Sequence, residues 1–267
     1  NKSQGSNRGA VLAGRLIESE NKLSRHTHLS HTHRHLMGRR RSAEEAGDPG
    51  GGERGTAKRV RNASPRDLVA AANASRDVVS LVVGTDAPDD ASTSTRGYVV
   101  DQLPDRLRRW CFDLTKRNME AMYTRTWGWS NPEKRRELAH SDARFLVAFK
   151  HKQPHRNDAD DDDDDTPIGF VHFRFEVEDS DGSPVAYVYE LQVEDEMKGR
   201  GVGTALMAAV ESIAKHAEMT RTALTVLKTN KGAGLFYERR GYVKDPDTPR
   251  DEACHYVILT KPTVKRG

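Results

Sequence analysis

Apolar side chains recur with two different periods along this chain, and the period changes near residue 144. Between Asp105 and Thr124 they are spaced three and four residues apart, which predicts an amphipathic helix of about that extent. From Arg144 onward, short apolar runs and alternating patterns predict strands instead. The expected strands are Arg144–Phe149, Ile168–Val177, Val185–Val193, Thr222–Leu227, Tyr242–Val243 and Cys254–Leu259.

Three further helices are expected from capping residues and one-sided apolar patterns. Ser64 followed by Pro65 is typical of a helix start. After the third strand, apolar residues at helical spacing continue from Leu206 to Ala217, and a short helix is expected at about Lys231–Arg240. The order of three strands, helix, strand, helix and strands predicts an α/β fold with a mixed central β-sheet flanked by helices.

Composition divides the chain into a tail and one folded domain. Residues 1–62 are rich in Arg, Ser, Gly and His without apolar periodicity, so we expect a disordered basic tail before the domain at 63–262. Basic clusters at 39–41 and 58–61 indicate either nuclear import and nucleic-acid contact or a solvated arm. The tail's histidine tract lacks a Cys or carboxylate frame, which favours a solvated arm over a metal site. The run at 158–165 is almost wholly aspartate, so it predicts an acidic loop insertion.

Charge and cysteine content narrow the expected setting. The 267 residues carry a formal net charge of +3, and no apolar run approaches the ~18 residues that would span a bilayer, so no membrane contact is expected. Two cysteines far apart in sequence, Cys111 and Cys254, indicate a reducing compartment. We expect a monomer in the nucleus and cytoplasm, with no metal and no redox cofactor.

One glycine-rich loop carries the main chemical signal. Gly199, Gly201 and Gly203 lie between the strand at 185–193 and the helix that follows it. Glycines let main-chain N–H groups face outward, and a helix start adds unpaired donors and about half a positive charge. Together they predict a diphosphate site that needs no metal. The glycine spacing differs from the G-x-G-x-x-G of dinucleotide-binding folds, and the loop follows a hairpin. Both observations argue against a dinucleotide-binding fold.

The loop is similar to that of a known enzyme family. The GNAT acetyltransferases carry Gln/Arg-x-x-Gly-x-Gly/Ala, which Lys198-Gly199-Arg200-Gly201-Val202-Gly203 resembles, and their second signature is similar to Asn230-x-x-Ala233-x-x-x-Tyr237-x-x-x-Gly241-Tyr242. The resemblance implies acetyl-CoA as co-substrate, held in a V-shaped cleft between the strands at 185–193 and 222–227. The implied cofactor-binding residues are Leu191, Gln192, Val193, Lys198, Gly199, Arg200, Gly201, Val202, Gly203, Thr204 and Asn230.

Further segments resemble one branch of that family, the NatD-type N-alpha-acetyltransferases. These segments are Trp110-x-Phe112-Asp113-Leu114-Thr115-Lys116-x-Asn118-Met119, Trp127-Gly128-Trp129, His172-Phe173-Arg174-Phe175 and Tyr187-Val188-Tyr189-Glu190. The resemblance spans about residues 64–261. It implies acetylation of the N-terminal serine α-amine of histone H4 and histone 2A, whose Ser-Gly-Arg-Gly tails are the expected partners.

The resemblance implies three catalytic residues. Glu190 is the expected general base, with Tyr189 beside it. Pairing with a cation or completing a strand edge is the other role open to Glu190. Tyr237 has the usual place of a proton donor to the CoA thiolate, with simple packing as the alternative. A peptide α-amine has a pKa of about 7.8 against about 10.4 for lysine, so its deprotonation costs about 3 kcal/mol less. A bulge near Glu190, also implied, would free a main-chain N–H within Leu191–Val193 to polarise the thioester carbonyl.

The acceptor peptide is expected to lie against acidic and aromatic side chains. Glu176 and Glu178, on one face of their strand, would hold the arginine of Ser-Gly-Arg. Trp127 would pack against the glycine, with Trp129 as the alternative, and core packing is the other role open to each aromatic residue. The implied substrate-binding residues are Tyr123, Trp127, Glu176, Glu178, Tyr187 and Tyr256.

Two other functions stay open at this point. A GNAT enzyme with these motifs could acetylate another N-terminus, a lysine or a small amine. The chain could also be a non-catalytic histone-binding adaptor that acts through its basic tail. The Trp-Gly-Trp and Tyr-x-Tyr-Glu segments favour the histone N-terminal acetyltransferase.

Overall fold

The computed structural model describes residues 63–77, 92–151 and 165–263, which build one seven-stranded sheet. Its strands are β1 (Thr93–Val99), β2 (Arg144–Lys150), β3 (Thr166–Val177), β4 (Pro184–Val193), β5 (Arg221–Leu227), β6 (Val243–Lys244) and β7 (Tyr256–Pro262). They lie in the order β1-β2-β3-β4-β5-β7-β6, and β4 and β5 form the one parallel pair within these ranges. The predicted mixed sheet is confirmed.

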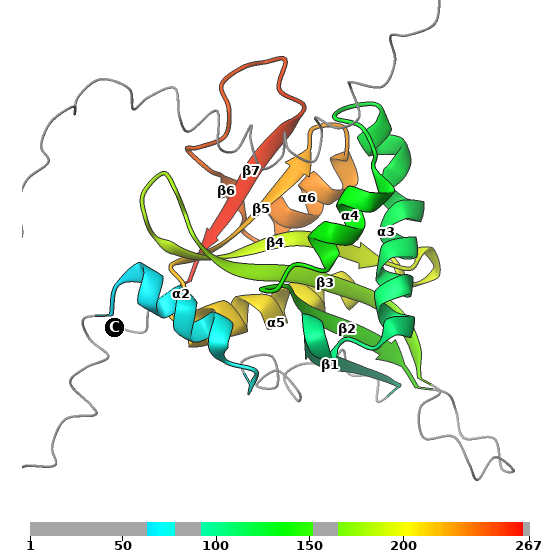
Figure 1. Cartoon of the computed structure of the whole chain (residues 1–267). Coiled ribbons are helices and arrows are strands. Elements are labelled where there is room, and N and C mark those ends of the chain that lie inside the picture. The colour runs from blue at the N-terminus through cyan, green and yellow to red at the C-terminus, as the bar shows by residue number, and fades with distance from the viewer. Residues whose placement is uncertain (1–62, 78–91, 152–164, 264–267) are drawn as a thin grey trace, which may run out of the picture.

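Helices cover both faces of this sheet (Figure 1). They are α2 (Pro65–Ala74), α3 (Asp105–Thr124), α4 (Asn131–Leu138), α5 (Val202–His216) and α6 (Lys231–Arg239), with 3₁₀ turns η3 (Val100–Gln102) and η4 (Asp195–Met197). On one face, α2 and α5 pack against apolar side chains of β2 to β5. On the other face, α3 packs over β2 and β3. No helix in the described ranges is long and apolar enough to cross a membrane.

Buried apolar stripes explain why α3 and α5 lie where they do. In α5, Leu206, Val210 and Ile213 recur at helical spacing and are almost completely buried. In α3, Leu107 and Leu114 play the same part on the opposite face. Burying a side chain of this size stabilises the fold by about 1.5–3 kcal/mol, so these two stripes hold the helices to the sheet.

The longest helix and the first helix start follow the sequence pattern closely. Helix α3 has the predicted bounds. Ser64 caps α2 in a reciprocal arrangement, because its hydroxyl accepts from the Asp67 N–H and the Asp67 carboxylate accepts from the Ser64 N–H. The remaining predicted strands and helices from Arg144 onward are present in the predicted order, within a few residues of the predicted bounds.

Two elements were missed by the sequence pattern. Strand β1 (Thr93–Val99) lies in a segment for which the sequence pattern predicts no element. Its seven residues are all half-buried, so they show no clear alternation of apolar and polar side chains. Helix α4 was not predicted because, of its eight residues, only Lys134 and Leu138 are buried, so it has almost no apolar face. Both elements lie at the margin of the α3 layer, where burial is incomplete.

Parts of the predicted tail and insertion lie outside the described residues. These are the basic clusters, the histidine tract and most of the aspartate run. The last residue of that run, Asp165, is described, and it is not simply solvated. Its carboxylate lies 2.5 Å from the Arg96 guanidinium and 2.9 Å from Nδ1 of His151. The aspartate run is thus anchored at its end to strand β1.

A buried arginine joins α2 to the sheet. Arg144 at the start of β2 is 2% exposed. Its guanidinium donates to the carbonyls of Ala72, Asn73 and Asp142 and to the side chain of Asn73, at 2.8–3.0 Å. The Asn73 amide in turn donates to the carbonyl of Phe175. These bonds satisfy carbonyls at the C-terminal end of α2 that the helix itself leaves without partners.

We therefore expect Arg144→Met to lower the free energy of unfolding by about 2–4 kcal/mol, because buried carbonyls lose their donors. Equilibrium denaturation in urea measures this loss. The matched control is Arg66→Met on the exposed side of α2, which should change stability by less than about 0.5 kcal/mol. Equal effects of the two substitutions would contradict the assigned role of Arg144.

Candidate active site

Strands β4 and β5 diverge in the middle of the sheet. Their parallel register runs only from Val185 opposite Arg221 to Val188 opposite Leu224, although both strands continue for several residues. A cavity opens where they separate. It is lined by Met119, Tyr123, Trp127, Val188, Tyr189, Glu190, Leu191, Gln192, Leu224, Thr225, Val226, Leu227, Asn230, Ala233 and Tyr237. The predicted splay between these strands is therefore present, and main-chain groups of β4 line it.

A bulge in β4 marks the same point. Opposite β3, Val188 pairs with Phe173 and Glu190 pairs with His172, so Tyr189 is the extra residue. Its ring stacks on His172, with centroids 5.2 Å apart, while the neighbouring Glu190 turns toward α4. The bulge expected near Glu190 is confirmed. It lets two consecutive side chains serve the same side of the sheet, which a regular strand forbids.

The Glu190 carboxylate is buried and fully surrounded by polar partners. It is 3% exposed. Its Oε1 accepts from Lys134 Nζ at 2.7 Å and from the Tyr123 hydroxyl at 3.4 Å, and its Oε2 accepts from Gln192 Nε2 at 2.7 Å. Lys134 also donates to Glu137 at 2.7 Å. A buried carboxylate without such partners would be strongly disfavoured, so the ion pair is what allows it to sit here.

Burial and charge act in opposite directions on this pair. Burial raises the pKa of Glu190, and the Lys134 ammonium works against that rise. For Lys134, burial alone would lower the pKa, but the carboxylates of Glu137 and Glu190 outweigh it, so the pKa lies well above the usual lysine value. Lys134 is thus a permanent cation beside Glu190 at neutral pH. Sequence reasoning missed Lys134 because α4 carries no motif.

The glycine loop has the backbone geometry of an anion site. Gly199 and Gly201 have φ values of 75° and 88°, which favour glycine. The first bond of α5 runs from the Ala205 N–H to the Gly201 carbonyl, and no side chain caps this helix start. The N–H groups of residues 202–204 precede that bond and point out of the helix end. Lys198 donates to Asp195 at 2.5 Å and half its side chain is exposed.

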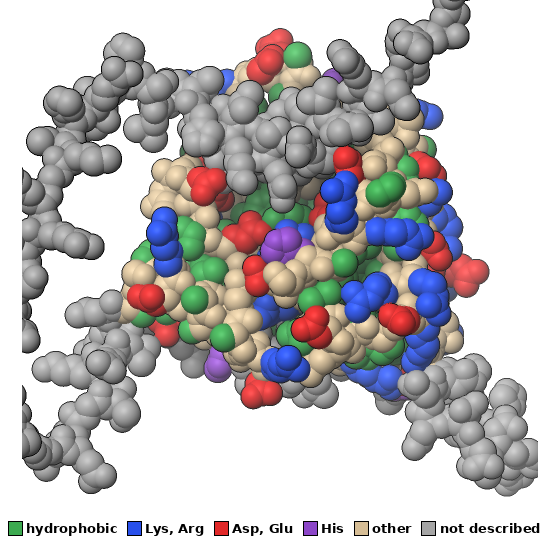
Figure 2. Space-filling model, viewed as in Figure 1, with side chains coloured by type: hydrophobic (Ala, Val, Ile, Leu, Met, Phe, Trp, Pro, Cys, Tyr) green, Lys and Arg blue, Asp and Glu red, His purple; other side chains and the backbone are tan. Residues whose placement is uncertain are grey.

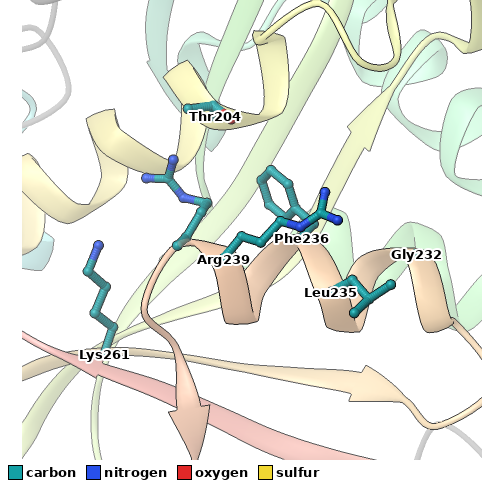
Figure 3. A pocket seen from close by; sticks show the side chains of 7 residues that line it. Thr204, Gly232, Leu235, Phe236, Arg239 and Lys261 are labelled. Carbon is teal, nitrogen blue, oxygen red and sulfur yellow. The ribbon is translucent and has the colours of Figure 1, made fainter.

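A basic hollow of about 590 Å³ adjoins this helix start. Figure 3 shows Thr204 at the start of α5 on one side, Phe236 and Arg239 of α6 on another, and Lys261 of β7 below. Arg239 is exposed, whereas Arg240 and Lys261 are held by Glu211 at 3.1 and 2.7 Å. The hollow can therefore take a further anion, and its basic residues are not specified by the sequence motifs.

Of the predicted aromatic residues, Tyr123 and Trp127 line the cavity. Trp127 packs against Tyr123 and Tyr256, with ring centroids 5.2 and 6.0 Å away. The Tyr187 hydroxyl lies 2.5 Å from Oγ1 of Thr225. Trp129 also stacks on Tyr123, with ring centroids 5.9 Å apart, but it packs on Phe112 as well and donates to Asn131. Of the two tryptophans considered for this place, Trp127 is the one that lines the cavity.

The two predicted acidic residues are separated by the structure. The Glu176 carboxylate accepts from the Tyr189 hydroxyl at 2.5 Å, beside the cavity. Glu178 lies past the end of β3, and its carboxylate faces Arg221 at 3.8 Å. The expectation that both project from one strand face stays a prediction, since β3 ends at Val177 and Glu178 lies just beyond it.

Three residues of the second motif, Asn230, Ala233 and Tyr237, line the cavity from α6 and its N-cap. Asn230 caps this helix, since its Oδ1 accepts from the Ala233 N–H at 3.2 Å. Tyr237 is 7% exposed, and burial first, then the Glu190 charge, raises the pKa of its phenol. The phenol therefore stays protonated at neutral pH and is able to donate.

Charge is unevenly spread around the site. Figure 2 shows acidic, histidine and hydrophobic side chains together near the middle of this face, while lysines and arginines gather on the side of α3. Within the described ranges, no three His, Cys, Asp or Glu side chains are grouped so that they could hold a metal. The site offers a buried carboxylate, phenols and main-chain donors.

Part of this chain matches the model of a known family. The model of the acetyltransferase (GNAT) family matches residues 116–242, slightly less than half of the chain and the part that contains the loop, the bulge and the cavity. Among curated proteins, the uncharacterized protein YdhI of Bacillus subtilis (strain 168) is 38% identical over 52 residues, or 20% of this chain. The chain spans about a third, 32%, of the length of that relative.

Solved structures of similar shape are all distant in sequence. Nourseothricin acetyltransferase is 23% identical, with 46% of this chain and 66% of that chain covered and a TM-score of 0.35. Arabidopsis thaliana Naa50, in complex with a bisubstrate analogue, is 17% identical, with 64% and 99% covered and a TM-score of 0.44. The PaiA N-acetyltransferase of Thermoplasma acidophilum, in complex with coenzyme A, is 20% identical, with 64% and 99% covered and a TM-score of 0.43.

The structure combines a mixed sheet with one splayed parallel pair, a bulged strand and a glycine loop that opens a helix. The splayed strands, the bulge and the loop all lie within residues 116–242, the part of the chain that matches the model of the acetyltransferase (GNAT) family.

We expect Gly201→Ala to weaken the binding of coenzyme A about tenfold or more, because a side chain at this φ forces the loop amides to reorient. Isothermal titration calorimetry measures the change. Gly182→Ala is the matched control, since Gly182 also has positive φ, at 68°, but lies in the β3–β4 turn. Both variants should lose similar stability, and unchanged affinity in Gly201→Ala would contradict the assigned anion site.

Proposed function

We propose that this chain transfers an acetyl group from acetyl-CoA to the α-amine of an N-terminal serine in Ser-Gly-Arg-Gly tails of histone H4 and histone 2A. The observation that carries the proposal is the buried Glu190 on the β4 bulge, at the bottom of a cavity walled by Tyr123 and Trp127. Of the residues just named, Glu190 and Trp127 lie in the branch-specific sequence segments. We propose the same setting as expected from the sequence: a monomer in the nucleus and cytoplasm.

The donor side of the reaction is supported by main-chain geometry. The helix start at residues 202–204 offers N–H groups and a positive helix end to the diphosphate of acetyl-CoA. The adjacent hollow with Arg239 offers a place for the remaining phosphate of the nucleotide end. From there the splay between β4 and β5 leads the thioester toward Glu190.

The acceptor side supplies the proton transfers. The α-amine nitrogen forms a bond to the acetyl carbon, the carbon–sulfur bond breaks, and the amine proton passes to Glu190 directly or through one water. Tyr237 donates a proton to the departing thiolate, which its raised pKa allows at neutral pH. Main-chain N–H groups of β4 beyond Val188, where β5 has diverged, polarise the thioester carbonyl.

The enclosed acceptor end favours an α-amine over a lysine side chain. At this end the ring of Trp127 packs between those of Tyr123 and Tyr256, with centroid distances of 5.2 and 6.0 Å. A Ser-Gly terminus brings little bulk to such a place. The α-amine is also about a quarter neutral at cytosolic pH, against about 0.1% for lysine, so the Glu190–Lys134 pair needs only modest basicity.

Glu176 is the residue we assign to the arginine of the tail. Its carboxylate lies beside the cavity and is oriented by the Tyr189 hydroxyl at 2.5 Å. A carboxylate fixed in this way can accept a charge-assisted hydrogen bond from a guanidinium. Glu178, engaged with Arg221, has a secondary part in this proposal.

Mass spectrometry of a Ser-Gly-Arg-Gly peptide incubated with enzyme and acetyl-CoA should show one acetyl group on the serine α-amine. Glu190→Gln should lower kcat by about 10²–10⁴, the usual contribution of a general base. A peptide acetylated beforehand should give no product. Turnover of the blocked peptide, or of a polyamine at equal rate, would contradict the proposed acceptor. If Glu190→Gln keeps both histone-tail binding and wild-type function, the chain acts as an adaptor and not as an enzyme.

Glu176→Gln should raise KM for the Ser-Gly-Arg-Gly peptide about tenfold and leave KM for a Ser-Gly-Leu-Gly peptide nearly unchanged, because only the first peptide loses a charged partner. Steady-state kinetics on both peptides gives the comparison. Asp179→Asn in the nearby turn is the control for a general change in surface charge. A similar rise for both peptides would remove Glu176 from arginine selection.

A further inference from the structure

Helix α4 places Lys134 between its own Glu137 and Glu190 of strand β4. The Lys134 side chain is 8% exposed, and its ammonium lies 2.7 Å from Oε1 of Glu190 and 2.7 Å from Oε1 of Glu137. Lysine is rarely buried unless it is paired, and here one cation serves two anions. The arrangement links α4, which has almost no apolar face, directly to the β4 bulge.

We infer that Lys134 is a positioning residue that keeps Glu190 ionised and correctly oriented as proton acceptor, and that Glu137 tunes this effect by competing for the same ammonium. This inference rests on the proposed acetyl transfer. It assigns a function to an element, α4, that carries no motif, and it makes the basicity of Glu190 a property of three residues.

The orientation of Glu190 is held from two sides. Lys134 donates to Oε1 and Gln192 donates to Oε2, and Asn118 of α3 donates to Gln192 at 3.0 Å. Each carboxylate oxygen has two acceptor positions. Oε1 uses both, for Lys134 and the Tyr123 hydroxyl, whereas Oε2 accepts from Gln192 and keeps its second position for a proton or a water. The carboxylate is therefore locked in direction without losing its capacity as a base.

The titratable groups around Glu190 come from four elements. From α4 come Lys134 and Glu137, from α3 the Tyr123 phenol, from α6 the Tyr237 phenol, and from β3 the neighbouring pair His172 and Arg174. Burial first, then Arg174, lowers the pKa of His172 well below its usual value, so His172 is neutral. Burial raises the pKa of both phenols, so they are neutral as well.

Within this set, Lys134 and Glu137 act on Glu190 with opposite sign. The Lys134 ammonium lowers the pKa of Glu190, and the Glu137 carboxylate raises it. If Lys134 only fastened α4 to the sheet, removing either partner would loosen the helix in the same way. If Lys134 sets the ionisation of Glu190, the two removals must shift its titration in opposite directions.

The test is a carboxyl-carbon NMR titration of the full chain labelled with ¹³C-glutamate, in which Glu190→Gln assigns the signal. Lys134→Met keeps the aliphatic stem but removes the charge, and it should raise the Glu190 midpoint by about one to three pH units. Glu137→Gln should lower the midpoint. Lys134→Arg, which keeps the charge, should leave the midpoint closer to that of the wild type than Lys134→Met does.

Kinetics provide the functional half of the test. With the Ser-Gly-Arg-Gly peptide, kcat of Lys134→Met should fall at neutral pH and recover as pH rises, because a higher Glu190 pKa moves the acid limb upward. Thermal unfolding and coenzyme A binding of each variant show that it remains folded.

The outcomes separate the inference from the proposed function. Wild-type activity in Glu190→Gln would overturn the base in the proposed function, whatever the titrations show. Loss of activity in Glu190→Gln together with midpoints that move in the same direction, or do not move, in Lys134→Met and Glu137→Gln would overturn the assignment of Lys134.

Discussion

Strand β4 is bonded to β3 along its whole length but to β5 only as far as Val188, and the site depends on that difference. The bond to β3 keeps the strand rigid where it carries Glu190. The missing bond to β5 leaves main-chain donors of the same strand facing a cavity. The bulge at Tyr189 falls at the same place, so the strand changes its twist where its second partner leaves. One interruption thus provides the opening, the donors and the direction of the carboxylate.

Burial of charge at this interruption has to be compensated locally. Glu190, Lys134, Glu137 and Gln192 satisfy one another within hydrogen-bonding distance. Removing one member of such a set leaves an uncompensated buried group, which typically costs 3–5 kcal/mol, while the intact set contributes little net stability. The set is better explained by the ionisation it imposes than by the stability it adds, and this accounts for a helix, α4, whose only buried side chains are Lys134 and Leu138.

The sequence predicts those parts of the molecule that depend on local pattern. Helix α3, the helix start at Ser64 and the succession of strands and helices from Arg144 onward follow from apolar spacing and capping. The positive φ values of Gly199 and Gly201 follow from the glycines themselves. Strand β1, helix α4 and the Glu178–Arg221 contact depend on long-range packing and have no local signal. The bulge was expected only by resemblance, because alternation alone would have placed Tyr189 and Glu190 on opposite faces.

The same division runs through the active site. Its donor half is built from main chain, at a glycine loop and a helix start, so any sequence that forms this turn can form it, and a short motif identifies it. Its acceptor half is built from side chains of α3, α4, β3, β4 and β7 that meet only after folding. Acceptor choice can therefore change by substitution at scattered positions while the donor half stays the same. The evidence for a particular acceptor must accordingly come from residues such as Trp127, Glu176 and Lys134, whose neighbours are set by the fold.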